Sequence, residues 1–205
     1  TTTLERLEQA QWRLAEPARS LAGCLLTARE TIMARLDQLE IADSLPMKTR
    51  FHGDYHLGQV LVAKDDVIII DFEGEPSRSL EERRHKNSPL RDVVGMLRSF
   101  NYAAHAALRQ STADGTTNWE ELASYIGDWE RLARTAFLEG YAEALRDCPS
   151  YPTDPEQAKA LLDLFTLEKA CYELRYELDN RPDWVAIPLG GLCELLSLET
   201  KDVPR

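Results

Sequence analysis

Acidic and amide side chains lie at both ends of one short segment of the chain. His52 and Asp54 come first, Gln59 follows five residues after Asp54, and Asp71-Phe72 closes the segment. Phosphoryl transfer from ATP requires a carboxylate that orients the acceptor hydroxyl, and ligands for the metal that neutralises the phosphates. Magnesium prefers oxygen ligands, which an aspartate and a side-chain amide both supply. These residue types in this order therefore suit a phosphotransferase site.

Two β-branched runs lie between these ends. Residues 60–63 and 67–70 are separated by the charged residues 64–66, a pattern that predicts an antiparallel hairpin. Because the turn is short, the segment that contains Asp54 and the segment that begins at Asp71 are expected to lie side by side.

The order and spacing of these residues resemble the catalytic loop and the Asp-Phe-Gly element of protein-kinase-like folds. The resemblance implies that Asp54 is the catalytic base and that Gln59 and Asp71 hold magnesium. Gln59 stands where those kinases commonly have Asn, and its amide oxygen can still act as a ligand. Glu73 stands in the place of the family glycine, so we expect it to contact the metal or one of its ligands.

Three further residues near this segment are candidates. For His52 we favour packing and hydrogen bonding that fix the loop over a role as a ligand. Asp92 lies in the first turn of a predicted helix, where a carboxylate gains from the helix dipole. The resemblance implies that Asp92 also orients the loop backbone, and both interpretations stay open. His56 is predicted to contact phosphate or sugar, the alternative being an exposed loop residue.

Four longer segments resemble one family more narrowly, the maltokinases of the aminoglycoside-phosphotransferase-like kinases. They are HGDYHLGQVL at 52–61, DFEGEP at 71–76, SPLRDVVGMLRSF at 88–100 and RPDWVAIPL at 181–189. Some members are fused to trehalose synthase. The resemblance implies transfer of the ATP γ-phosphate to the anomeric hydroxyl of maltose, giving maltose 1-phosphate for α-glucan and glycogen synthesis. It implies ATP and Mg²⁺ as cofactors, and trehalose synthase as a partner.

Other functions fit the same residues. One alternative is another small-molecule kinase of this fold, for aminoglycosides, choline or a different sugar. Another is a non-catalytic kinase-like module that docks a trehalose synthase. The chain also has no Gly-rich nucleotide-covering loop, and nothing before residue 50 has a strand pattern. We therefore expect the C-terminal lobe of the kinase-like fold without the N-terminal nucleotide lobe, inactive by itself.

Helical patterns occupy most of the remaining chain. Apolar residues recur at spacings of three and four, and Pro17 interrupts the first such stretch. Ser88 can cap a helix whose first position is Pro89. Residues 77–88 are charged and irregular. Helical patterns are found at 4–39, 89–110, 122–144, 155–180 and 189–198.

The expected fold is therefore mostly α with a small β-hairpin. We expect one domain over residues 1–205, with three functional parts. These are a helical lead-in at 1–48, the catalytic loop and metal-binding hairpin at 49–76, and a helical substrate-binding subdomain at 89–200.

One helix face near the end of the chain could bind a sugar. Glu173, Tyr176, Glu177 and Asn180 recur at intervals of three and four residues, so they share one face. Carboxylates and amides hydrogen-bond sugar hydroxyls, and Trp184, just past the helix, could supply an aromatic platform. The alternative is a surface stripe of salt bridges with a tryptophan in the core.

Composition excludes several classes of partner. The 205 residues carry 24 Lys plus Arg against 35 Asp plus Glu, a formal net charge of −11. Such an acidic chain is a poor binder of nucleic acid or of anionic membranes. No apolar run is long enough to span a bilayer, the N-terminus does not resemble a signal peptide, and the four cysteines show no paired spacing. We expect reduced thiols and a cytoplasmic location.

Overall fold

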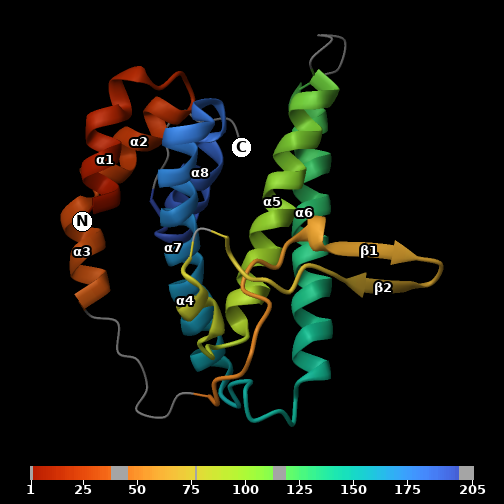
Figure 1. The fold of residues 1–205 in the computed structure, drawn as a ribbon. Coiled ribbons are helices and arrows are strands. Elements are labelled where there is room, and N and C mark those ends of the chain that lie inside the picture. Colours follow the sequence, from red (N-terminus) through yellow and green to blue (C-terminus); the bar gives the residue numbers. More distant parts are fainter. Residues whose placement is uncertain (1, 38–45, 77, 113–118, 199–205) are drawn as a thin grey trace. The chain divides into compact units, whose positions relative to one another are not determined.

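Helices dominate the computed structural model, which describes residues 2–37, 46–76, 78–112 and 119–198 (Figure 1). Contacts divide the chain into two units, one formed by Thr1–Asp43 with Thr166–Arg205 and the other by Ser44–Phe165. Each unit has its own buried apolar cluster. None of the described helices combines the length and apolarity needed to cross a membrane. The functional parts expected at 1–48, 49–76 and 89–200 stay a prediction.

The first unit is entirely helical in its described part. The periodic leucines of the N-terminal stretch form its core, with Leu7 and Leu25 almost fully buried against Leu174 and Leu189. Its elements are α1 (Thr2–Ala10), η1 (Gln11–Arg13), α2 (Ala18–Thr27), α3 (Arg29–Asp37), the C-terminal part of α7 (Pro155–Asn180), η3 (Pro182–Trp184) and α8 (Ala186–Leu195). The predicted interruption at Pro17 is confirmed, because α2 begins immediately after it.

The second unit carries the candidate chemistry. Long helices α5 and α6 pack side by side, and the N-terminal part of α7 completes the core around Leu90, Val94 and Phe165 (Figure 1). Its elements are η2 (Leu57–Gln59), β1 (Val60–Ala63), β2 (Asp66–Ile69), α4 (Leu80–Arg84), α5 (Leu90–Thr112), α6 (Trp119–Ala144) and the start of α7. The predicted cap is confirmed, since the Leu90 N–H donates to the Ser88 hydroxyl at 3.3 Å.

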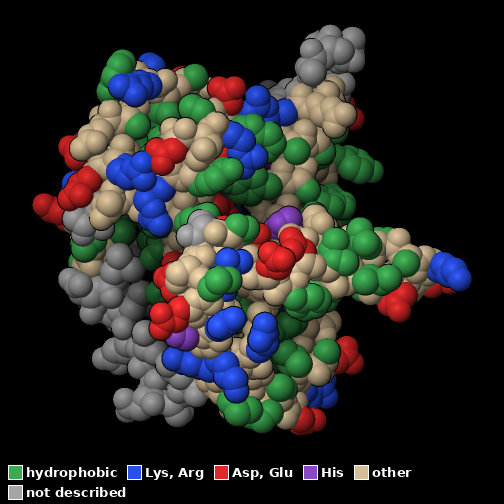
Figure 2. Space-filling model, viewed as in Figure 1, with side chains coloured by type: hydrophobic (Ala, Val, Ile, Leu, Met, Phe, Trp, Pro, Cys, Tyr) green, Lys and Arg blue, Asp and Glu red, His purple; other side chains and the backbone are tan. Residues whose placement is uncertain are grey.

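The predicted hairpin is confirmed. Strand β1 pairs antiparallel with β2 in the register Val60↔Ile69 to Ala63↔Asp66. The turn therefore has two residues, Lys64 and Asp65, rather than the three expected, and Lys64 adopts a positive φ of 59°. Both strands are exposed except at the half-buried Val60, and Val62 is 80% exposed. The hairpin therefore extends from its unit as an apolar projection that ends in charged side chains (Figures 1 and 2).

Two expectations about elements were wrong. Residues predicted to be irregular at 77–88 contain helix α4, which is stabilised by a capping box. The Ser79 hydroxyl accepts the Glu82 N–H, and the Glu82 carboxylate accepts the Ser79 N–H. The last helix begins at Ala186, three residues earlier than expected at 189, and ends at Leu195. None of the four cysteines, Cys24, Cys148, Cys171 and Cys193, forms a disulfide within the described residues, and their reduced state stays a prediction.

Candidate active site

His52 connects the candidate catalytic loop to the end of the hairpin. Its ring is buried, with 6% of the side chain exposed. Nδ1 accepts the Asp54 N–H at 3.3 Å, so the ring proton lies on Nε2, which donates to the Ile70 carbonyl at 2.8 Å. The ring also contacts Phe72, with 4.9 Å between centroids. His52 thus contacts both the backbone of Asp54 and the residue before Asp71, and its role in positioning the catalytic loop stays a prediction.

Asp92, in the first turn of α5, holds the same loop from a later segment of the chain. Its carboxylate accepts the backbone N–H groups of His52 at 2.6 Å and of Gly53 at 2.9 Å. Burial raises the pKa of Asp92, while these two hydrogen bonds oppose that rise by favouring the ionised form. The carboxylate therefore holds two backbone groups of the loop, and the catalytic importance of this contact stays a prediction.

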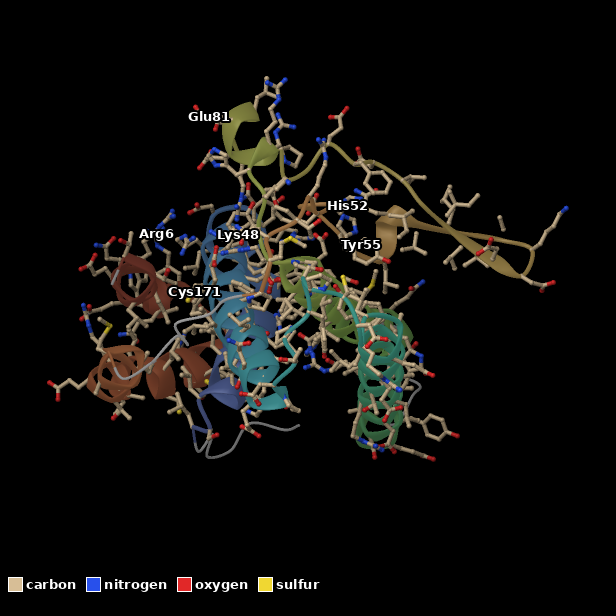
Figure 3. The ribbon with its side chains drawn as sticks, turned by 90° about the horizontal axis from the view of Figure 1, so that it is seen from below. Arg6, Lys48, His52, Tyr55, Glu81 and Cys171 are labelled. Atoms are coloured by element: carbon tan, nitrogen blue, oxygen red, sulfur yellow. The ribbon has the colours of Figure 1, made fainter. Side chains whose placement is uncertain are left out.

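The loop lies very close to helix α5. A Cβ atom added at Gly95 would lie 2.4 Å from the Tyr55 carbonyl oxygen, so only glycine allows this approach. Figure 3 shows His52 and Tyr55 close to each other, where the chain leads into the hairpin. Neither the hydrophobic period nor the motif spacing pointed to Gly95.

Gln59 and Asp71 come together across the base of the hairpin. The Gln59 Nε2 atom donates to the Asp71 carboxylate at 3.0 Å, and the Ile70 N–H donates to the Gln59 carbonyl at 3.0 Å. Gln59 is buried and Asp71 is exposed, with a positive φ of 63°. The predicted neighbourhood of these two side chains is therefore present.

These two side chains fit a magnesium ion in their donor chemistry. Gln59 and Asp71 each carry a hard oxygen donor, and magnesium usually takes few protein ligands beside water and phosphate. The amide nitrogen of Gln59 faces Asp71, so joint ligation requires the amide to rotate until its oxygen faces the same point. Among the described residues, no group of three or more His, Cys, Asp or Glu side chains is arranged to hold a metal. Glu73 is exposed, its carbonyl accepts from Arg83 at 3.3 Å, and its carboxylate forms no hydrogen bond with Gln59 or Asp71. A metal contact of Glu73 stays a prediction.

Asp54 lies in the loop with its side chain 24% exposed, so it is accessible yet partly shielded from water. The Nε2 atom of His56 lies 4.0 Å from the Asp54 carboxylate. His56 Nδ1 accepts the Gly58 N–H at 3.0 Å and so begins the short helix η2. Catalytic or substrate contacts of these two residues stay predictions.

The sugar-binding residues predicted on the helix face at 173–184 lie in the first unit, and Arg181 contacts three of them. Glu177 is 99% buried and pairs with Arg181 through two hydrogen bonds, of 2.6 and 2.9 Å. The same guanidinium lies over the rings of Tyr176 and Trp184, at 5.5 and 5.2 Å. Arg181 was missed in the sequence analysis, although Glu177 and Arg181 have the four-residue spacing of a helical ion pair.

The other two members of that face differ from each other. Glu173 is buried, and the Asn180 side chain donates back to the Tyr176 carbonyl at 2.8 Å. The face is therefore an ordered cluster of charge and aromatic rings, closer to the salt-bridge alternative than to a free array of sugar ligands. Sugar binding by these residues stays a prediction.

Comparison with known proteins adds a second line of evidence. No protein-family model matches the chain. It is 32% identical over 180 residues to a glucosamine kinase of Mycolicibacterium smegmatis (strain ATCC 700084 / mc(2)155), covering 86% of this chain and 42% of the relative. It is 27% identical over 152 residues to a glucosamine kinase of Streptacidiphilus jiangxiensis, covering 74% of this chain and 32% of the relative. The chain thus spans less than half of the curated relatives it matches.

Solved structures agree on the fold. A glucosamine kinase in complex with glucosamine, ADP and inorganic phosphate superposes with a TM-score of 0.69 at 22% identity, covering 95% of this chain and 43% of that one. A second crystal form of glucosamine kinase gives a TM-score of 0.68. The chain has the fold of one part of glucosamine kinase. Both relatives described above are glucosamine kinases, so the narrower expectation of a maltokinase is not supported, whereas the expectation of a kinase-like relative is.

Proposed function

We propose that the natural protein carrying this chain is an ATP-dependent sugar kinase, and that this chain supplies its catalytic loop and metal-binding segment. The observation that carries the proposal is the meeting of Gln59 and Asp71 at 3.0 Å, with His52 joining the loop to the residue before Asp71. Local sequence similarity to two glucosamine kinases supports the same activity.

Each residue has a distinct role in this proposal. Asp54 accepts the proton of the acceptor hydroxyl and aims its oxygen at the phosphorus atom. Gln59 and Asp71 would hold magnesium, which when bound neutralises phosphate charge. His52 and Asp92 act through the backbone, because they fix the position from which the Asp54 carboxylate reaches the substrate.

The acceptor we favour is glucosamine rather than maltose, because both of the curated relatives compared above are glucosamine kinases. The nucleotide site is expected to include residues beyond this chain. The chain contains no Gly-rich phosphate-binding loop, and its hairpin exposes an apolar surface at the base of the candidate site.

The test is an acceptor panel with the full natural protein, ATP and magnesium. Phosphorylation of glucosamine above maltose, choline and an aminoglycoside is the expected result. Asp54→Asn should lower kcat roughly 10²–10⁴-fold with the KM for ATP little changed, because it removes only the proton acceptor. An Asp54→Asn protein with near-normal kcat would show that Asp54 is not the base. If the full natural protein phosphorylated none of the four acceptors, the proposal of a sugar, choline or aminoglycoside kinase would be rejected.

A further inference from the structure

A cavity of about 480 Å³ lies beside the catalytic loop, within the unit formed by Ser44–Phe165. Its volume falls in the roughly 300–1,000 Å³ range of small-molecule sites. None of Asp54, Gln59 and Asp71 is among its lining residues. The cavity is therefore separate from the acidic and amide groups proposed for phosphotransfer, although His52 and Asp92 belong to both surroundings.

The lining is dominated by aromatic rings. Two precede or follow the loop, one follows the hairpin and two come from α6; they are Phe51, Tyr55, Phe72, Phe137 and Tyr141. Ring faces carry negative electrostatic potential and attract cations, the more strongly when water is excluded. Burial, with a smaller contribution from Asp92, raises the pKa of Tyr141 to about 12, so its hydroxyl is neutral at physiological pH.

One carboxylate in the lining, that of Asp92, interacts electrostatically with the His52 ring but forms no ion pair with a Lys or Arg of the described residues. Asp92 accepts hydrogen bonds from two backbone N–H groups, and none of the described residues forms an ion pair with it. Arg50 also lines the cavity, but its side chain is exposed and makes no salt bridge with Asp92. A partly buried carboxylate without a countercharge costs free energy, which a cation bound nearby would reduce.

We propose that this cavity binds a small organic ammonium ion, with its apolar body among the aromatic rings and its charge against Asp92. The rings supply dispersion and cation–π attraction, and Asp92 supplies the countercharge. Because Asp92 holds the backbone of His52 and Gly53, the occupied cavity is linked directly to the catalytic loop. The inference concerns binding alone and does not depend on the proposed kinase activity.

The test uses three probes that share one ring but differ in charge: benzylammonium, benzyl alcohol and benzoate. Titrations of the isotope-labelled full chain are followed by NMR. We expect saturable shifts at Gly53, Tyr55 and Tyr141 with benzylammonium, binding at least about tenfold weaker for benzyl alcohol, and none for benzoate. Equal affinity for the alcohol and the ammonium would overturn the proposal. So would shifts that do not saturate and spread over the acidic surface.

A matched pair of variants locates the site. Tyr141 and Tyr151 lie 6.0 Å apart between ring centroids and pack against the same apolar cluster, but only Tyr141 lines the cavity. Tyr141→Leu should weaken benzylammonium binding, and Tyr151→Leu should leave it unchanged. Equal loss in the two variants contradicts the site. Because Asp92→Asn also loosens the loop that lines the cavity, benzylammonium and benzyl alcohol are both titrated into this variant. Benzylammonium should lose its preference over benzyl alcohol, and an equal loss of affinity for the two probes would show that Asp92 is not the countercharge.

Discussion

Asp92 receives a hydrogen bond of 2.6 Å from the backbone N–H of His52, a residue forty positions earlier in the chain. The first turn of α5 therefore determines where the candidate catalytic loop lies. The Gly53 N–H donates a second hydrogen bond to the other carboxylate oxygen, so the interaction is bidentate. It therefore fixes the orientation of the loop as well as its position. The candidate base Asp54 follows immediately.

Removal of the Asp92 charge should release the loop. In Asp92→Asn one carboxylate oxygen becomes an NH₂ group that cannot accept the backbone N–H. We expect roughly tenfold to hundredfold lower kcat in the full natural protein, because the base is misplaced. We also expect about 1–3 kcal/mol lower unfolding free energy. Faster amide exchange at Gly53 and Asp54 is the specific readout.

Asp128→Asn is the control for that variant. Asp128 is exposed on α6 and pairs at 3.0 Å with Arg131, so its loss should change stability by less than about 0.5 kcal/mol. If Asp92→Asn retained wild-type exchange at Gly53, the anchoring role would be wrong.

Gly95 should not tolerate a side chain. In Gly95→Ala the new Cβ would meet the Tyr55 carbonyl at 2.4 Å, and the loop would have to move away from α5. We expect a loss of about 1–3 kcal/mol in unfolding free energy, measured by denaturant titration. Gly140→Ala in α6 is the matched control, since its Cβ would meet no atom within 4 Å. That control should gain about 0.5–1 kcal/mol from helix propensity.

Gln59→Leu tests the amide as a metal ligand. The change keeps the approximate volume of a buried side chain but removes both the hydrogen bond to Asp71 and the oxygen donor. We expect the magnesium concentration at half-maximal activity to rise roughly tenfold to a hundredfold in the full natural protein. Gln59→Asn, which keeps a shorter amide, should recover part of this loss. An unchanged magnesium dependence in Gln59→Leu would remove Gln59 from the site.

Asp92 should also make the unfolding free energy depend on pH. Burial raises the pKa of Asp92 in the folded state above the ordinary value of 3.8. At pH values between 3.8 and the raised pKa, the folded state therefore keeps a proton that the unfolded state has lost. Its contribution is fully present below pH 3.8 and is lost as pH rises through the raised pKa. The stability of the wild type relative to Asp92→Asn should therefore fall with rising pH across this window. A flat difference in paired denaturant titrations from pH 3 to pH 7 would contradict it.

Much of this architecture follows from local pattern. The β-branched runs at 60–63 and 67–70 form a hairpin because a short charged turn can close only antiparallel strands. That closure is also why Gln59 and Asp71 were expected to meet. The capping box of α4 was likewise visible in the spacing of Ser79 and Glu82, although the charge of the segment obscured it.

The tertiary structure alone decided the contacts between distant segments. The approach of Tyr55 to Gly95 and the aromatic cavity depend on how the catalytic loop packs against α5 and α6, and side-chain spacing within one element does not encode that packing. The sequence by itself determined which residues could take part in phosphotransfer and which strands bring them together. Packing decided which backbone groups hold them, because hydrogen bonds between segments forty residues apart form only once the core has brought their elements into contact.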